Sequence, residues 1–187
     1  MASDRLPAVD DVPTVGGVSD VHHVVQLNVG RLLAPLDAPA TADFVAALEP
    51  INALADRAPG FVWRLQTEAG DATGIRAFDD DLLIVNMSVW ESVEALAAFT
   101  YGAGHRDVMR RRREWFEPMA EAHMVLWWVP AGHVPDVDEA KDRLALLRRI
   151  GPSPAAFTFR TMYPFGHDEP VSVGPQPGRV TLGTRPS

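Results

Sequence analysis

Three short stretches of this 187-residue chain alternate apolar and polar side chains with a period of two, which is typical of β-strands. A fourth apolar stretch is also a predicted strand, but both its faces are apolar, so its register cannot be read. Strands are therefore predicted over residues 22–30, 61–67, 82–90 and 123–129, and helices with apolar positions at 3.6-residue spacing over 41–58, 92–119 and 137–150. These elements leave few folds to consider.

The predicted order is strand, helix, strand, strand, helix, strand, followed by one more helix. This order predicts an α+β, ferredoxin-like βαββαβ subunit with an antiparallel sheet and an extra C-terminal helix. The expected organisation is a flexible lead-in over residues 1–20, a domain over 21–160 and an irregular tail over 161–187. Pro50 should kink or split the first helix. Glycines 102 and 104 should interrupt the second, which resumes at His105.

The first three strands have two different faces. One face is a row of apolar residues such as Val25 and Leu27, as needed for packing against helices. The opposite face mixes polar and apolar residues: Gln26, Asn28, Arg64, Gln66, Asn86 and Ser88 with Val24, Val62, Ile84 and Trp90. This mixed face is too apolar for open water, although exposure is the simpler alternative. Two sheets packed across a dyad would cover it, which predicts a homodimer that encloses a cavity.

Composition removes several function classes. The net charge of −8 argues against nucleic acid as a partner, and the arginine run 110–113 is interpreted mostly as a solvated helix face. The chain has no cysteine, and its histidines lack metal-ligand spacing, so no metal site is expected. Neither a membrane-spanning stretch nor a signal peptide is recognisable, which predicts a cytoplasmic protein without a membrane partner.

Five segments carry a resemblance to a known family: QLNVGRLLAPLD, FVAALEPINALADRAPGFVWRLQ, VNMSVWESVEALAAF, GHRDVMRRRREWFEPM and LWWVPAGHVP. Over roughly residues 22–160 the chain resembles the DUF3291 family of the dimeric α/β-barrel superfamily, which also holds the antibiotic-biosynthesis monooxygenases. The resemblance implies a ferredoxin-like subunit that dimerises through its sheets. It implies no single activity, because the superfamily spans cofactor-free monooxygenases, haem enzymes and aldoxime dehydratases.

Two groups of residues are candidates for a small-molecule site. Helical spacing places His105, Arg112 and Trp115 on one inward stripe. His105 could be a general base, a haem ligand or a structural histidine, and Arg112 could bind an anionic ligand or reach outward to solvent. The second group lies on the mixed face and could line a pocket or form a dimer-interface network: Asn28, Arg64, Asn86, Ser88 and Trp90.

The first functional hypothesis is a cofactor-independent monooxygenase for an aromatic or polyketide-type substrate in bacterial secondary metabolism. In it, His105 takes a proton, and Asn86 and Arg64 stabilise the resulting anion. The remaining candidates would bind or enclose the substrate: Asn28, Ser88, Trp90, Arg112 and Trp115. The alternatives are a haem enzyme with His105 as axial ligand, a cyclase or isomerase, and a non-catalytic dimer that binds a small ligand.

Overall fold

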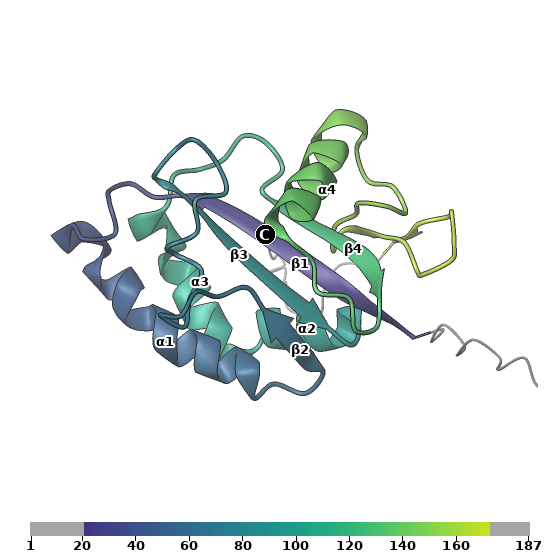
Figure 1. The fold of residues 1–187 in the computed structure, drawn as a ribbon, viewed down its shortest axis with the longest axis horizontal. Coiled ribbons are helices and arrows are strands. Elements are labelled where there is room, and N and C mark those ends of the chain that lie inside the picture. Colours follow the sequence, from purple (N-terminus) through teal and green to yellow (C-terminus); the bar gives the residue numbers. More distant parts are fainter. Residues whose placement is uncertain (1–20, 173–187) are drawn as a thin grey trace, which may run out of the picture.

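A four-stranded antiparallel sheet in the order β2-β3-β1-β4 forms the centre of the computed structural model (Figure 1). The structure describes residues 21–172, without the side chains of Ala103, residues 105–108 and Ser172. Its elements are β1 (His22–Arg31), α1 (Ala42–Asp56), β2 (Phe61–Arg64), β3 (Leu83–Trp90), α2 (Val93–Thr100), α3 (Ala103–Trp115), β4 (Met124–Pro130) and α4 (Val137–Ile150), with a 3₁₀ turn, η1 (Pro39–Thr41), before α1. This order and topology confirm the ferredoxin-like α+β prediction.

The register of the sheet places the polar residues of the mixed face beside one another. Asn28 lies opposite Asn86 on the neighbouring strand, and Gln26 lies opposite Ser88. Arg64 pairs with Ser88 from the other side. The register of β4, which the sequence left open, pairs Gln26 with Leu126, so Leu126 belongs to the same face. One polar band therefore crosses the middle of the sheet.

Most helix ends follow from local sequence. The Ser92 side chain accepts a hydrogen bond from the Ala95 N–H, and the Asp136 side chain caps α4 through the Glu139 N–H. Two helix predictions need correction. The helix α1 continues through Pro50 without a break, and α3 begins at Ala103 and ends at Trp115. Within residues 21–172, no helix is both long enough and apolar enough to cross a bilayer.

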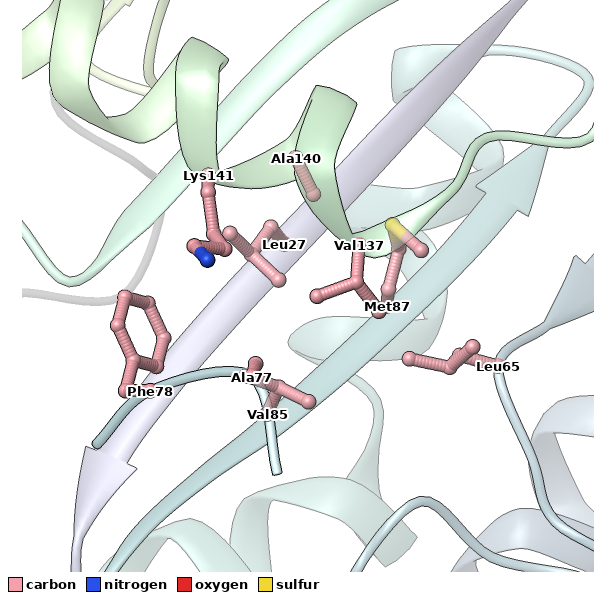
Figure 2. Close-up of a pocket in the computed structure, with 9 residues that line it drawn as sticks. All are labelled: Leu27, Leu65, Ala77, Phe78, Val85, Met87, Val137, Ala140 and Lys141. Carbon is pink, nitrogen blue, oxygen red and sulfur yellow. The ribbon is translucent and has the colours of Figure 1, made fainter. Parts of the chain in front are cut away.

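The apolar face of the sheet packs under α4 and the loop that precedes β3. Val25, Leu27 and Val29 share one buried cluster with Ala140, Leu144 and Leu147 of α4. Figure 2 shows Leu27 and Met87 of the sheet facing Val137 and Ala140, with a void of only about 10 Å³ between them. The Trp127 N–H donates to the Glu139 carboxylate at 2.7 Å, which ties α4 to β4. The apolar face therefore packs against a helix, as the sequence predicts.

The mixed face is covered by α1, α2 and α3, which lie across the sheet from α4 (Figure 1). Val93 and Leu96 of α2 pack on Trp90, while Phe44 of α1 and Trp115 of α3 pack on Ile84. The prediction that this face is covered is confirmed for Val24, Ile84 and Trp90. Val62 is a correction, because it lies at the register shift between Phe61 and Trp63 and is 41% exposed. The reason given for a dimer is wrong, because helices of the same chain supply the cover.

A homodimer stays a prediction. It is no longer supported by the argument that a partner subunit must cover the mixed face. Its contacts would have to lie outside the two helix-covered faces of the sheet. Light scattering over micromolar concentrations should give twice the mass of one chain. A mass of one chain throughout that range would contradict the prediction.

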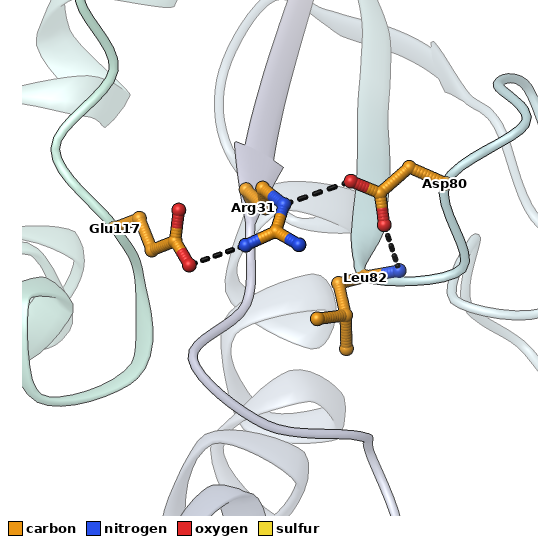
Figure 3. A network of polar contacts seen from close by, with 4 residues as sticks. All are labelled: Arg31, Asp80, Leu82 and Glu117. Carbon is orange, nitrogen blue, oxygen red and sulfur yellow. Dashed lines mark hydrogen bonds and ion pairs between the residues drawn. The ribbon is translucent and has the colours of Figure 1, made fainter.

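Three charged side chains fasten the end of β1 to its surroundings (Figure 3). The Arg31 guanidinium donates to the Asp80 carboxylate at 2.8 Å and also to the Glu117 carboxylate. The second Asp80 oxygen accepts the Leu82 N–H at 2.9 Å. The Arg31 hydrogen bond, followed by that of Leu82, lowers the pKa of Asp80 from its usual value. This network joins β1 to the segments that precede β3 and follow α3.

Because the pKa of Asp80 is lowered in the folded state, the network stabilises the fold above the unfolded-state pKa of about 3.9. This stabilisation is lost as the pH falls through the lower, folded-state pKa. We therefore expect the wild type to melt above Asp80→Asn at neutral pH, and the two melting temperatures to converge below about pH 4. The matched control is Asp79→Asn, at an exposed neighbour. If the difference in melting temperature between the wild type and Asp80→Asn did not change with pH, the stabilising role of the Asp80 carboxylate would be contradicted.

Beyond α4 the described chain ends in a short two-stranded sheet, β5 (Thr161–Met162) and β6 (Val171–Ser172). Residues 161–172 are therefore less irregular than expected. Phe157 exchanges two backbone hydrogen bonds of 2.8 Å with Leu126, which adds this segment to the outer edge of β4. The predicted lead-in, residues 1–20, and the last part of the predicted tail lie outside the described residues.

Candidate functional site

A cavity of about 340 Å³ lies between the mixed face of the sheet and the helices α1–α3. Its size is in the range of pockets that hold small organic molecules. Seven of the eight predicted site residues line it: Asn28, Arg64, Asn86, Ser88, Trp90, Arg112 and Trp115. The structure thus brings together the strand group and the helix group, which lie far apart in the sequence. The alternative that the strand group forms a dimer interface loses its support, because α1–α3 cover this face.

His105 is the remaining predicted site residue, and its side chain lies outside the described part of the chain. Its backbone belongs to the first turn of α3, which begins at Ala103 after the Gly102 cap. The role of His105 therefore stays a prediction.

The floor of the cavity contains a short chain of hydrogen bonds. The Trp90 indole N–H donates to the Ser88 hydroxyl at 2.9 Å, and this hydroxyl donates to the Gln26 side-chain oxygen at 3.3 Å. Ser88 is only 7% exposed and Trp90 only 1%. The cross-strand register puts Asn28 and Asn86 next along the same floor. Three amide side chains therefore lie close together on this surface.

Aromatic rings form much of the wall. The Trp90 ring meets Phe61 edge-on at 5.3 Å between ring centroids and stacks on Phe99 at 5.1 Å. Near α3, Trp115 packs at a tilt on Phe44, with centroids 5.7 Å apart. Such walls suit a flat, apolar ligand body, while the amide floor suits polar substituents.

Arg64 is less available than the sequence suggests. Its Nε donates to the Asp56 carboxylate at 2.8 Å, and its Nη2 donates to the other oxygen at 3.2 Å. Its Nη1 donates to the Gly70 carbonyl at 2.7 Å, and the side chain is only 14% exposed. This bidentate pair fixes the guanidinium and offsets its charge. We therefore assign Arg64 to holding the wall together, in place of the predicted role as anion stabiliser.

Arg112 is the contrasting case. It lines the cavity half-buried, and among the described residues its guanidinium has no hydrogen bond or ion pair. Its neighbour Arg111 faces outward, where it bonds Asp43 at 2.7 Å and Glu114 at 2.8 Å and lies over the Trp115 ring. Hydrogen bonds from Glu114 first, and then Asp43, raise the pKa of Arg111. Arg112 is thus a cation left for a ligand, while Arg111 joins α3 to α1.

Several polar residues of the cavity were missed as site residues, among them Gln26 and His123. Gln26 was placed on the mixed face but not assigned a role, and its part in the hydrogen-bond chain depends on Ser88. His123 precedes β4 and lines the cavity, and its Nδ1 is buried without a hydrogen-bond partner in the described structure. A buried, unpaired ring nitrogen is costly, so a ligand that pairs with it would be favoured. The one available signal was its position at the start of the predicted strand 123–129.

Gly30 and Phe116 pack closely against each other in the lining of the cavity. A methyl group added at Gly30 would lie 2.7 Å from two ring carbons of Phe116. The ring of Phe116 therefore lies directly against the backbone of β1, and both residues line the cavity.

At the described positions, no group of three or more histidine, aspartate or glutamate residues could hold a metal ion.

Comparison with known families decides the relationship. The model of a domain of unknown function, DUF3291, matches residues 23–172, which is most of the chain. The chain belongs to this family. The family prediction is thereby confirmed, while the family description names no activity. No match was found among curated proteins.

Solved structures give a weaker likeness. SnoaB, a cofactor-independent oxygenase from Streptomyces nogalater, is 19% identical with a TM-score of 0.38, over 61% of this chain and 98% of its own. A Nitrosomonas europaea protein named for antibiotic biosynthesis monooxygenases is 16% identical with a TM-score of 0.40, over 62% and 95%. PA3566 from Pseudomonas aeruginosa is 13% identical with a TM-score of 0.40, over 63% and 100%. At these scores the likeness carries no argument about activity.

Proposed function

We propose that this protein is an enzyme that oxidises an electron-rich aromatic small molecule directly with O₂, without a bound cofactor. The observation that carries the proposal is the cavity, in which aromatic walls meet an amide floor and the cation Arg112, which has no ion pair among the described residues. Such a site can hold a flat phenolic molecule and stabilise its anion. A role in bacterial secondary metabolism and a cytoplasmic location remain part of the proposal.

The chemistry requires that the substrate first loses a proton. An acidic CH₂ group beside a phenolic ring gives an anion that can transfer electrons to O₂ without a metal. One oxygen atom then replaces the two hydrogens as a carbonyl, and the other leaves as water, so CH₂ and O₂ become C=O and H₂O. The substrate supplies all four electrons. The protein has to take up one proton, hold the anion and keep water from the ring.

Two histidines are candidates for the proton acceptor. The sequence predicts His105, at the first turn of α3, where the helix dipole disfavours a charged ring. The structure adds His123, whose buried Nδ1 has no hydrogen-bond partner among the described residues. Replacing a general base should lower the rate by about 10²- to 10⁴-fold.

A suitable test measures O₂ uptake with 1,8-dihydroxyanthrone, an anthrone with an acidic CH₂ group. We expect uptake above the spontaneous rate in the wild type and a large loss in either His105→Ala or His123→Ala. His167→Ala, at an exposed turn, is the matched control. Wild-type uptake equal to that of heat-denatured protein, across several anthrones and naphthols, would overturn the proposal.

The haem alternative predicts a different result from the same protein. It depends on His105 as axial ligand, so a haem-loaded preparation should show a Soret absorption band that disappears in His105→Ala. Our proposal predicts that purified protein supplied with haem during expression shows no such band. Stoichiometric haem that is lost in this variant would replace cofactor-independent oxidation with haem chemistry.

A further inference from the structure

We infer that the chain Trp90–Ser88–Gln26 makes Gln26 an obligatory hydrogen-bond donor to the cavity, and that Gln26 and Arg112 together select ligands with an anionic oxygen. Phenolates and aromatic carboxylates are the ligand classes that this pair would take. The inference uses the cavity of the proposed function and names the chemistry of its ligand. It concerns binding and holds whether or not the bound molecule is oxidised.

The direction of the chain follows from what each group can do. An indole nitrogen can only donate, so the Trp90 N–H must point at the Ser88 oxygen, 2.9 Å away. The Ser88 hydroxyl has one hydrogen, and the acceptor within reach is the Gln26 side-chain oxygen at 3.3 Å. That contact orients the amide. Its oxygen is directed to Ser88, and its NH₂ group is left for the cavity.

Burial keeps this orientation in place. Trp90 is held between Phe61 and Phe99 and is only 1% exposed, so its N–H is out of reach of solvent and keeps its hydrogen bond to Ser88. If Gln26 flipped its amide, its NH₂ would face the Ser88 hydroxyl. The Ser88 hydrogen would then lose its acceptor inside a buried site, which is unfavourable. The fixed indole therefore sets the polarity of an amide two hydrogen bonds away.

Charge in the cavity favours the same class of ligand. The cation Arg64 is neutralised by Asp56. Asp71, an acidic residue of the lining, lies beside Gly70 at the Arg64 end, where one of its oxygens is bound by the Thr73 N–H and hydroxyl. Arg112 lacks such a partner in the described structure. Arg112 and Gln26 line the same cavity, so an anionic ligand there would be offered both the guanidinium and the NH₂ group.

The test compares two ligands of the same ring system, 2-naphthoate and neutral 2-naphthalenemethanol, by calorimetry. We expect the wild type to bind the anion at least 10-fold more tightly, because hydrogen bonds to a charged oxygen are the stronger ones. In ¹⁵N-labelled protein, the Trp90 indole N–H resonance should shift on binding of naphthoate, as the hydrogen-bond chain tightens. Neither ligand has an acidic CH₂ group, so this assay is independent of oxidation.

Two variants test the residues. Gln26→Glu keeps an oxygen for Ser88 but replaces the NH₂ with negative charge, and Arg112→Met removes the cation. Each should lower naphthoate affinity by about 10- to 100-fold and change naphthalenemethanol affinity by less than about 3-fold. Arg113→Met, at the exposed neighbour, is the control and should bind as the wild type does. Thermal melts confirm that each variant is folded.

Three outcomes would overturn the inference. They are equal wild-type affinity for the two ligands, a naphthoate preference that survives in Gln26→Glu, and no binding of either ligand at millimolar concentration. The two proposals fail separately. Naphthoate selectivity without O₂ uptake would leave the binding inference standing and remove the oxygenase, whereas O₂ uptake without selectivity would do the reverse.

Discussion

The variant Leu27→Asp is expected not to fold. Leu27 is only 2% exposed and lies between Met87 of β3 and Ala140 of α4 (Figure 2). A carboxylate at this position would be buried without a partner, which costs several kcal/mol. The whole stability of a domain is only about 5–15 kcal/mol. We therefore expect insoluble protein, or soluble protein without the near-ultraviolet circular dichroism of packed tryptophans.

The control for this variant is Leu33→Asp, a short distance beyond the same strand, where the side chain is 52% exposed. It should fold and melt close to the wild type, because its carboxylate stays in water. A folded Leu27→Asp protein with wild-type melting would mean that α4 does not cover this face of the sheet.

The second large effect is expected for Trp90→Ala, at about 3–5 kcal/mol of lost unfolding free energy. Its ring is the contact point of β3 with Phe61 and Phe99, and its removal leaves a hole that rigid neighbours fill only in part. Urea unfolding measures the loss. Trp90→Phe keeps most of the apolar contact but removes the N–H, so it should lose less stability. If both variants lost the same amount, the N–H would account for the effect and the ring packing would not.

Much of the sheet could be predicted because alternation and register are local properties. Asn28 and Asn86 each lie on the polar side of an alternating strand, and any antiparallel pairing that keeps the faces in register brings such residues close. The end of α4 was equally readable, since Gly151 at φ 77° adopts a conformation that favours glycine. These features depend on a few neighbouring residues.

The covering of each face could not be predicted in the same way. A period of two shows which side chains share a face, but it does not say which helix will cover that face. Both α4 and the pair α1 and α3 have apolar stripes, and the choice between them depends on connections across the whole chain. The dimer argument failed at this step, because it left Val24 and Trp90 uncovered by their own subunit.

In the candidate site, too, some features depend on local sequence and others on the fold of the whole chain. Cavity residues on strands could be predicted from their face, as with Asn86 and Ser88. The ion pair of Arg64 with Asp56 joins the end of a helix to an edge strand, and the sequence spacing of the two residues does not predict it. His123 lies directly before β4, so its nearness to the cavity depends on how the preceding loop enters the sheet.

The close packing of Gly30 against Phe116 suggests a way to change the size of the cavity by substitution. Neither residue has a polar side chain, and both line the cavity. A single methyl at residue 30 would push the ring away from the strand and change the space beside it. Every hydrogen-bonding group of the site would stay in place. The size of the cavity could therefore be changed at Gly30 without changing Gln26 and Arg112, the residues that would select the charge of the ligand.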